Sequence, residues 1–125
     1  SQPAEIVRSL LAVLIDTHRR HHQLIVAFIA RAAREPGHHP QAFAFRRLVV
    51  ERLAALAVPR GDLVRHPDPA RATEFAANAV FSILQTRLVS GMLGGPAEPL
   101  DDAALSLELE RLVLAYLGIG DPHAT

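Results

Sequence analysis

Histidines are the residues of this sequence whose spacing comes closest to a chemical site. His18 and His22 are four residues apart, so they share one face of a continuous helix, and His21 lies beside them. Two histidines at this spacing can ligate zinc, but the segment is not a His-Glu-x-x-His motif, and the nearest carboxylate is Asp16. We therefore expect a half-buried histidine at a helix junction, hydrogen-bonded to a carbonyl group.

Two alternatives to this structural role remain open. His22 could line the pocket of an effector, or His18 and His22 could bind a metal ion together with His38 or His39. The sequence contains no cysteine, which excludes a disulfide framework, a thiolate zinc site and a cysteine nucleophile. We predict no cofactor.

Paired arginines are the second group with chemical potential. Arg19-Arg20 and Arg46-Arg47 could recognise an anionic effector, although most arginines here should be solvated. The carboxylates are scattered, with no pair at acid–base spacing on one face. No nucleophile elbow and no glycine-rich phosphate loop is present. We predict that the chain is not an enzyme.

Length and composition indicate a single domain over residues 1–125. Half of the residues are hydrophobic, and 13 basic side chains balance 13 acidic ones, so the formal net charge is zero. A neutral chain gives no electrostatic reason to expect a nucleic-acid or membrane surface. Its apolar runs are too short to span a membrane and its N-terminus lacks a signal pattern, so we predict a cytoplasmic protein.

Clusters of proline and glycine divide the chain into helices. No segment shows the alternation or the β-branched enrichment of a strand, so we predict an all-α fold. Asp68 with Pro69, and Asp101 or Asp102, are expected to begin helices, and Gly118 to end one. The five predicted helices span residues 3–20, 22–34, 40–57, 69–90 and 101–117, and the first two could be one kinked or continuous helix.

The last two predicted helices carry more apolar surface than one core needs. In helix 69–90 the polar residues gather in a narrow stripe, and the apolar arc is about twice the roughly 100° that docks a surface helix. Helix 101–117 has a second apolar face as well. We interpret these faces as a dimer interface, with a central position in a monomeric bundle as the alternative. The interface candidates are Ala72, Ala76, Ala79, Val80, Ile83, Arg87, Leu105, Leu109, Leu112 and Tyr116.

The order of segments resembles the C-terminal regulatory domain of TetR-family bacterial repressors. The resemblance rests on the helix entry His-Pro-Asp-Pro-Ala-Arg-Ala at 66–72, the long helix through Val89, the ending Leu-Glu-Arg-Leu-Val-Leu-Ala-Tyr-Leu-Gly at 109–118, and the segment 10–35. It implies a five-helix, bundle-like domain whose last two helices form a four-helix bundle in a homodimer. It also implies a small effector and operator DNA, the latter only through a helix-turn-helix domain absent from this chain.

A pocket for such an effector should be mostly apolar with a few aimed polar groups. Aromatic residues are its natural walls, and Asn78 and Ser82 could orient a ligand. The pocket candidates are His22, Phe28, Phe45, Phe75, Asn78, Phe81 and Ser82. The expected effector is small and apolar or amphipathic. The alternatives are a dimerisation module without an effector and a histidine-based metal-binding bundle.

Overall fold

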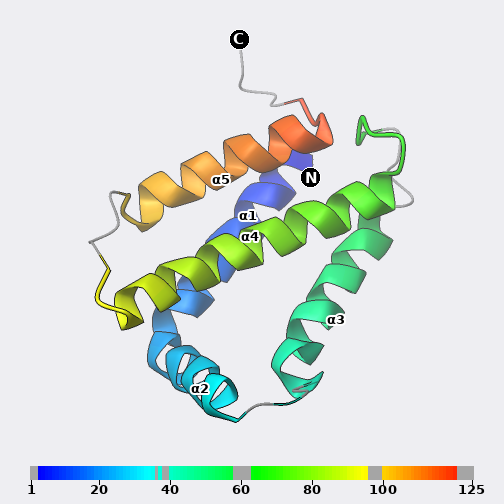
Figure 1. Ribbon diagram of the computed structural model, residues 1–125. Helices are drawn as coiled ribbons and strands as arrows, with labels where there is room; N and C mark the ends of the chain where they lie inside the picture. The colour runs from blue at the N-terminus through cyan, green and yellow to red at the C-terminus, as the bar shows by residue number, and fades with distance from the viewer. Residues whose placement is uncertain (1–2, 36, 38–39, 58–62, 96–99, 121–125) are drawn as a thin grey trace.

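The computed structural model describes residues 3–35, 37, 40–57, 63–95 and 100–120, and these contain five helices and no strand (Figure 1). The predicted all-α class is confirmed, although the fourth helix ends at Met92 rather than Ser90. None of the described helices is long and apolar enough to cross a membrane. The helices are α1 (Pro3–Arg20), α2 (His22–Arg34), α3 (Pro40–Ala57), α4 (Pro69–Met92) and α5 (Asp102–Leu117).

Short acidic side chains and a glycine set the ends of α4 and α5. The Asp68 carboxylate accepts a hydrogen bond from the backbone N–H of Arg71 at 3.2 Å. Asp101 caps α5 in the same way, accepting from the N–H of Ala104 at 2.8 Å. Both bonds satisfy an N–H that has no partner within the helix. α5 ends at Gly118, whose left-handed φ of 66° suits a residue without a Cβ atom.

A kink at His21 separates α1 from α2. His21 donates its N–H to the Thr17 carbonyl at 3.1 Å, and Ile25 donates its N–H to the His21 carbonyl at 2.9 Å. Helical hydrogen bonds therefore continue across the junction, while the direction of the chain changes (Figure 1). Of the two possibilities that the sequence left open, the structure has the kinked pair.

Three helices build most of the hydrophobic core. α4 crosses the middle of the molecule, with α5 on one side of it and α1 behind it in the view of Figure 1. A fully buried aliphatic side chain contributes about 1.5–3 kcal/mol, so most of the stabilising burial lies in these helices. The core cluster comprises Leu11, Ile15, Val64, Ala72, Ala76, Val80, Leu84, Leu105, Leu109, Val113 and Leu117.

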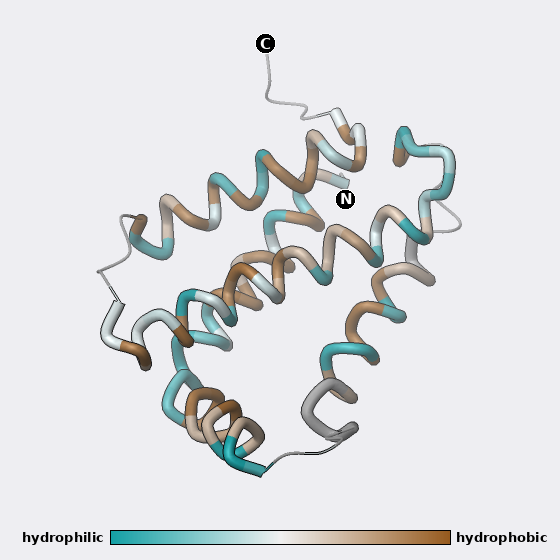
Figure 2. Tube along the Cα trace, in the orientation of Figure 1, coloured by the Kyte–Doolittle hydropathy of each residue, from teal (hydrophilic) through white to brown (hydrophobic). Residues whose placement is uncertain are grey.

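The other two helices are packed less completely. No residue of α2 is buried, and its Phe28 side chain is 49% exposed. α3 packs on α4 through the buried Val50 and Ala54, whereas its Phe45 is 67% exposed. Figure 2 shows hydrophobic residues along α2, none of which is buried. We call α1, α4 and α5 the packed half of the domain, and α2 and α3 the open half.

An ion pair fastens α1 to α5 within the packed half. The Arg8 guanidinium donates from Nε to both oxygens of the Glu110 carboxylate, at 3.0 and 3.1 Å, and from Nη2 to Oε1 at 2.6 Å. Glu110 is buried, so its charge needs this partner. The pair thus links the first and last helices of the fold at a position that neither helical periodicity nor spacing indicates.

Candidate functional site

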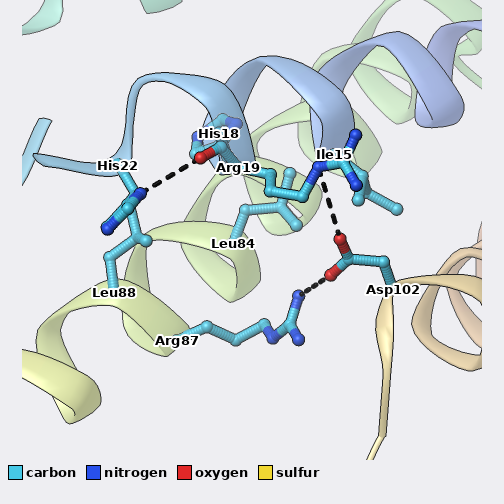
Figure 3. A pocket seen from close by; sticks show the side chains of 8 residues that line it. All are labelled: Ile15, His18, Arg19, His22, Leu84, Arg87, Leu88 and Asp102. Carbon is cyan, nitrogen blue, oxygen red and sulfur yellow. Dashed lines mark hydrogen bonds and ion pairs between the residues drawn. The ribbon is translucent and has the colours of Figure 1, made fainter.

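A cleft opens where the end of α1, the first residue of α2, the second half of α4 and the first residue of α5 meet (Figure 3). Its volume is about 250 Å³. Apolar side chains of α1 and α4 form its floor, and charged or polar side chains form its rim, which is the usual composition of a small-molecule site. The lining residues are Ile15, His18, Arg19, His22, Leu84, Arg87, Leu88 and Asp102.

The rim of the cleft is held together by Asp102. Arg87 Nη1 lies 3.2 Å from Asp102 Oδ1, and Arg19 Nε lies 4.0 Å from Asp102 Oδ2 (Figure 3). Arg87 also donates from Nη2 to the Leu100 carbonyl at 3.3 Å. The Arg87 side chain is 23% exposed and that of Arg19 is 68% exposed, so Arg87 is the more firmly enclosed of the two. One carboxylate of α5 therefore faces two guanidinium groups from two other helices.

Backbone carbonyls orient both histidines of the cleft. His18 Nδ1 lies 2.8 Å from the Leu14 carbonyl oxygen, and His22 Nδ1 lies 3.1 Å from the Arg19 carbonyl oxygen. A carbonyl oxygen only accepts, so each Nδ1 donates, and whenever the ring is neutral its lone pair is on Nε2. The predicted hydrogen bond to a carbonyl group is confirmed for both rings. His18 is half-buried as expected, whereas His22 is exposed.

Metal binding would require a third ligand close to these two rings. Within the described part of the chain, no group of three or more His, Asp or Glu side chains is placed to hold a metal ion. His38 and His39, the other proposed ligands, lie outside the described residues. His18 and His22 both line the cleft, and a neutral ring whose Nδ1 donates to a carbonyl can accept a hydrogen bond at Nε2.

Arg46 makes a second polar cluster, between α3 and α4. Its Nε donates to Asn78 Oδ1 at 3.0 Å, and its Nη2 donates to the Asn78 carbonyl at 2.8 Å and to Ser82 Oγ at 2.9 Å. Nη1 donates to Gln85 Oε1 at 3.3 Å, and the guanidinium lies 5.5 Å from the centroid of the Phe81 ring. Burial lowers the pKa of Arg46, but an arginine stays charged at neutral pH. The polar stripe of α4 is therefore a docking site for α3.

Two further hollows border the open half. A groove of about 500 Å³ beside Arg46 is lined by Arg47, Glu51 and Glu74 as well, so both charge signs are present and it shows no preference for an anion. A smaller cavity of about 80 Å³ lies between α1, α3, α4 and α5. Its walls are apolar apart from Thr73, whose hydroxyl donates to the Pro69 carbonyl at 2.9 Å.

An apolar surface remains uncovered where α4 and α5 run side by side. Phe75 is 63% exposed, Leu112 52% and Tyr116 39%. The Phe75 and Tyr116 rings bridge the two helices, with their centroids 5.5 Å apart. Ala79 and Ile83 continue the surface one and two turns further along α4 and are partly buried. We call these five residues the α4–α5 face.

The model of the tetracyclin repressor-like C-terminal domain matches residues 3–117 of the chain, from the first residue of α1 to the last residue of α5. The chain belongs to this family. A comparison with curated proteins and one with solved structures gave no match. The resemblance to TetR-like regulators is confirmed, and with it the general character of the domain: it is of the kind that serves as the ligand-binding and dimerisation region in this family, which is regulatory rather than enzymatic.

Half of the predicted dimer contacts of this TetR-like domain lie inside its own core. Five of the ten candidate side chains are not available to a second copy, because α4 and α5 already pack them against helices of the same chain. Among the other candidates, Arg87 faces the cleft, and the remainder belong to the α4–α5 face. The corrected residues are Ala72, Ala76, Val80, Leu105 and Leu109.

The seven pocket candidates do not come together in one site. Phe28 and Phe45 are exposed on α2 and α3, and Phe75 belongs to the α4–α5 face. Phe81 is buried, with the His18 ring 6.1 Å from it. Asn78 and Ser82 are occupied by Arg46, so of the seven only His22 lines the cleft.

The ion bridge of the cleft was not predicted from the sequence. Arg19 was expected among possible anion-binding residues, Arg87 in the dimer interface and Asp102 at a helix cap. One signal was available, because Arg87 is a lone charge within an otherwise apolar arc of α4. An arginine in such a place needs a carboxylate or a ligand beside it. What the sequence could not show is which carboxylate lies there, because the Asp102 partner comes from the next helix.

Proposed function

We propose that this TetR-like domain pairs two copies of its regulator through the α4–α5 face and senses a small molecule in the cleft between α1, α4 and α5. The observation that supports the pairing is the exposure of Phe75, Leu112 and Tyr116 on two helices that otherwise form the core. A contiguous apolar surface is costly in water and marks an interaction site. A second copy, related by a twofold axis, would cover it with the same surface and form a four-helix bundle.

Sensing would work through the relative positions of the helices. A ligand shifts a conformational equilibrium only by the difference between its affinities for the two states. The cleft lies among α1, α4 and α5, so a molecule bound there touches both the first helix of the domain and the two helices of the proposed interface. We infer that such binding alters the DNA affinity of a helix-turn-helix domain outside these 125 residues.

The pairing is tested by light scattering with two matched variants. Leu112→Arg places a charge on the α4–α5 face, whereas Leu107→Arg places one at the 47%-exposed Leu107, elsewhere on the same helix. We expect the wild type and Leu107→Arg to be dimers at tens of micromolar, and Leu112→Arg to be a folded monomer by circular dichroism. A monomeric wild type, or a dimer that both substitutions leave intact, would overturn the proposed interface.

Sensing is tested by a thermal-shift screen with metabolite-sized compounds. A molecule that binds only the folded state raises the apparent melting temperature by mass action. At least one compound should raise it in the wild type, and Leu88→Trp, which fills the floor of the cleft, should abolish that shift. If the only shifts persist in Leu88→Trp, the cleft is not the sensing site; if no compound produces a shift, the domain is a dimerisation module.

A further inference from the structure

We propose that the cleft binds a small organic carboxylate, with Arg87 as its main partner and Arg19 as the second. This inference rests on the proposed function, because it names the chemical class of the molecule sensed there. The charges around the cleft favour an anion. Arg19 and Arg87 line it with one carboxylate between them, and the neighbouring Asp16 is already shared by Arg19 and Arg20 at 2.7 and 2.8 Å. Three guanidinium groups thus face two carboxylates.

Arg87 has hydrogen-bond donors to spare. Among the described residues, its Nη1 donates to Asp102 and its Nη2 to the Leu100 carbonyl, which leaves Nε–H and one N–H on each terminal nitrogen. A carboxylate accepts two parallel N–H bonds from a guanidinium in the strongest form of this contact. Because the Arg87 side chain is mostly enclosed, the contact would form with little competition from water.

The floor of the cleft determines the size and polarity of the rest of the ligand. Ile15, Leu84 and Leu88 provide apolar walls, and the volume of about 250 Å³ exceeds the roughly 150 Å³ that suffices to hold a benzene ring. The Nε2 lone pairs of His18 and His22 would accept a hydrogen bond from a hydroxyl group. The fitting ligand is therefore a carboxylate on a short apolar body, with a hydroxyl group as an additional contact.

The Asp102 carboxylate occupies the position that a ligand anion would compete for. It lies at the first turn of α5 and joins α5 to α4 through Arg87 and, more loosely, to α1 through Arg19. A bound carboxylate would take over part of these contacts and release the start of α5 from the other two helices. Asp102 thus competes with the ligand for the two arginines, and removal of its charge should raise the affinity of the cleft for an anion.

The inference is tested by NMR titration of the 125-residue chain with benzoate, following the methyl signals of Ile15, Leu84 and Leu88. Benzyl alcohol has the same ring without the charge and serves as the matched ligand. We expect saturable shifts of these methyl groups with benzoate, and at least about tenfold weaker binding of benzyl alcohol, as for loss of a charged hydrogen bond.

Variants identify the residues responsible. Arg87→Gln should lower the affinity for benzoate at least about tenfold. Arg19 is more exposed, so Arg19→Gln should lower it by about two- to fivefold. Asp102→Asn should raise the affinity for benzoate several-fold, which is about the effect of removing a competing exposed charge. Arg111→Gln, whose Glu108 partner lies on the surface of α5, is the control and should change nothing. Circular dichroism checks that each variant is folded.

Three outcomes would overturn the proposal. The first is the absence of methyl shifts with benzoate at about 20 mM, where even a millimolar ligand is close to saturation. The second is equal affinity for benzyl alcohol and benzoate, and the third is that neither Arg87→Gln nor Arg19→Gln lowers the affinity for benzoate. Failure here is distinguishable from failure of the proposed function. A monomer that binds benzoate through Arg87 overturns the pairing alone. A dimer whose cleft binds only uncharged compounds overturns the carboxylate alone.

Discussion

α5 and α2 illustrate how differently the two halves of this domain are built. α5 has 16 residues, of which six are buried, and its caps at Asp101 and Gly118 are both formed. α2 has 13 residues, of which none is buried, and its first residue follows the kink without a side-chain cap. Both helices have ample apolar residues in the sequence, but only α5 lies against a core. Apolar content alone therefore does not show where a chain is stable.

The difference fits the two tasks that we propose for this TetR-like domain. A dimerisation surface needs a rigid support, and the α4–α5 face lies on the helices that form the core. A sensing region needs helices that can move at small cost, and segments with few buried contacts are the ones that open locally. α2, which has no buried residue, has that character. The cleft lies at the boundary, where α1 ends and α2 begins.

Truncation of a core side chain should give the largest contrast between the halves. Leu11→Ala in α1 removes a side chain that is 3% exposed, and we expect the free energy of unfolding to fall by about 2–5 kcal/mol. Phe28→Ala in α2 removes a larger side chain that is half exposed, and should cost less than about 1 kcal/mol. Urea denaturation measures both. Equal losses would show that α2 is packed as well as α1.

Loss of the buried ion pair should have the next largest effect. Arg8→Ala leaves the Glu110 carboxylate buried without its main partner, and we expect a loss of about 1–3 kcal/mol in denaturant unfolding. Arg111→Ala removes the surface pair with Glu108 and should cost no more than about 1 kcal/mol. If both variants lose the same stability, the Arg8–Glu110 pair does not fasten α1 to α5.

The end of α5 gives a smaller test of the packed half. Gly118→Ala forces an alanine into a left-handed conformation, at about 1–2 kcal/mol, and places its Cβ 2.6 Å from Cβ of Arg65. Gly120→Ala meets no atom within 4 Å at a φ outside the left-handed region, and should be close to neutral. Thermal unfolding compares the two. A Gly118→Ala variant as stable as Gly120→Ala would mean that this helix end is not packed as described.

Acid should slightly lower the stability contributed by Asp16 near the end of α1. The hydrogen bond from Arg19 holds the pKa of Asp16 below its ordinary 3.8, with the charge of Arg20 acting in the same direction. Because the folded state has the lower pKa, the contribution of Asp16 to stability is present above about pH 3.8 and is lost as the pH falls through the folded pKa. An NMR titration should give a midpoint below 3.8 that rises in Arg19→Gln. An unchanged midpoint would assign the lowering to another group.

Local signals made the helices predictable. Asp68, Asp101 and Gly118 act on their own backbone, so their roles follow from neighbouring residues, and the structure confirms them. The partners of each helical face were not predictable in the same way. Ala72 and Ala76 suit a close approach of any helix, and nothing in their spacing separates a helix of the same chain from one of a second copy.

The same limit applies to the candidate site. The carbonyl partners of His18 and His22 are local, and a histidine hydrogen-bonded to a carbonyl group was predicted at this junction. The contacts of Arg46 with Asn78 and Ser82, and of Arg87 with Asp102, join different helices and depend on how those helices cross. Long side chains such as arginine reach partners that helical periodicity does not specify.

Amide hydrogen exchange on the native chain tests the division into two halves most directly. We predict that the central amides of α4 and α5 exchange slowest, near the rate of global unfolding, and that those of α2 exchange at least about a hundredfold faster. Addition of a cleft ligand should slow the amides at the junction of α1 and α2. Protection of α2 equal to that of α4 and α5 would contradict the account, because the domain would then be one uniformly packed unit.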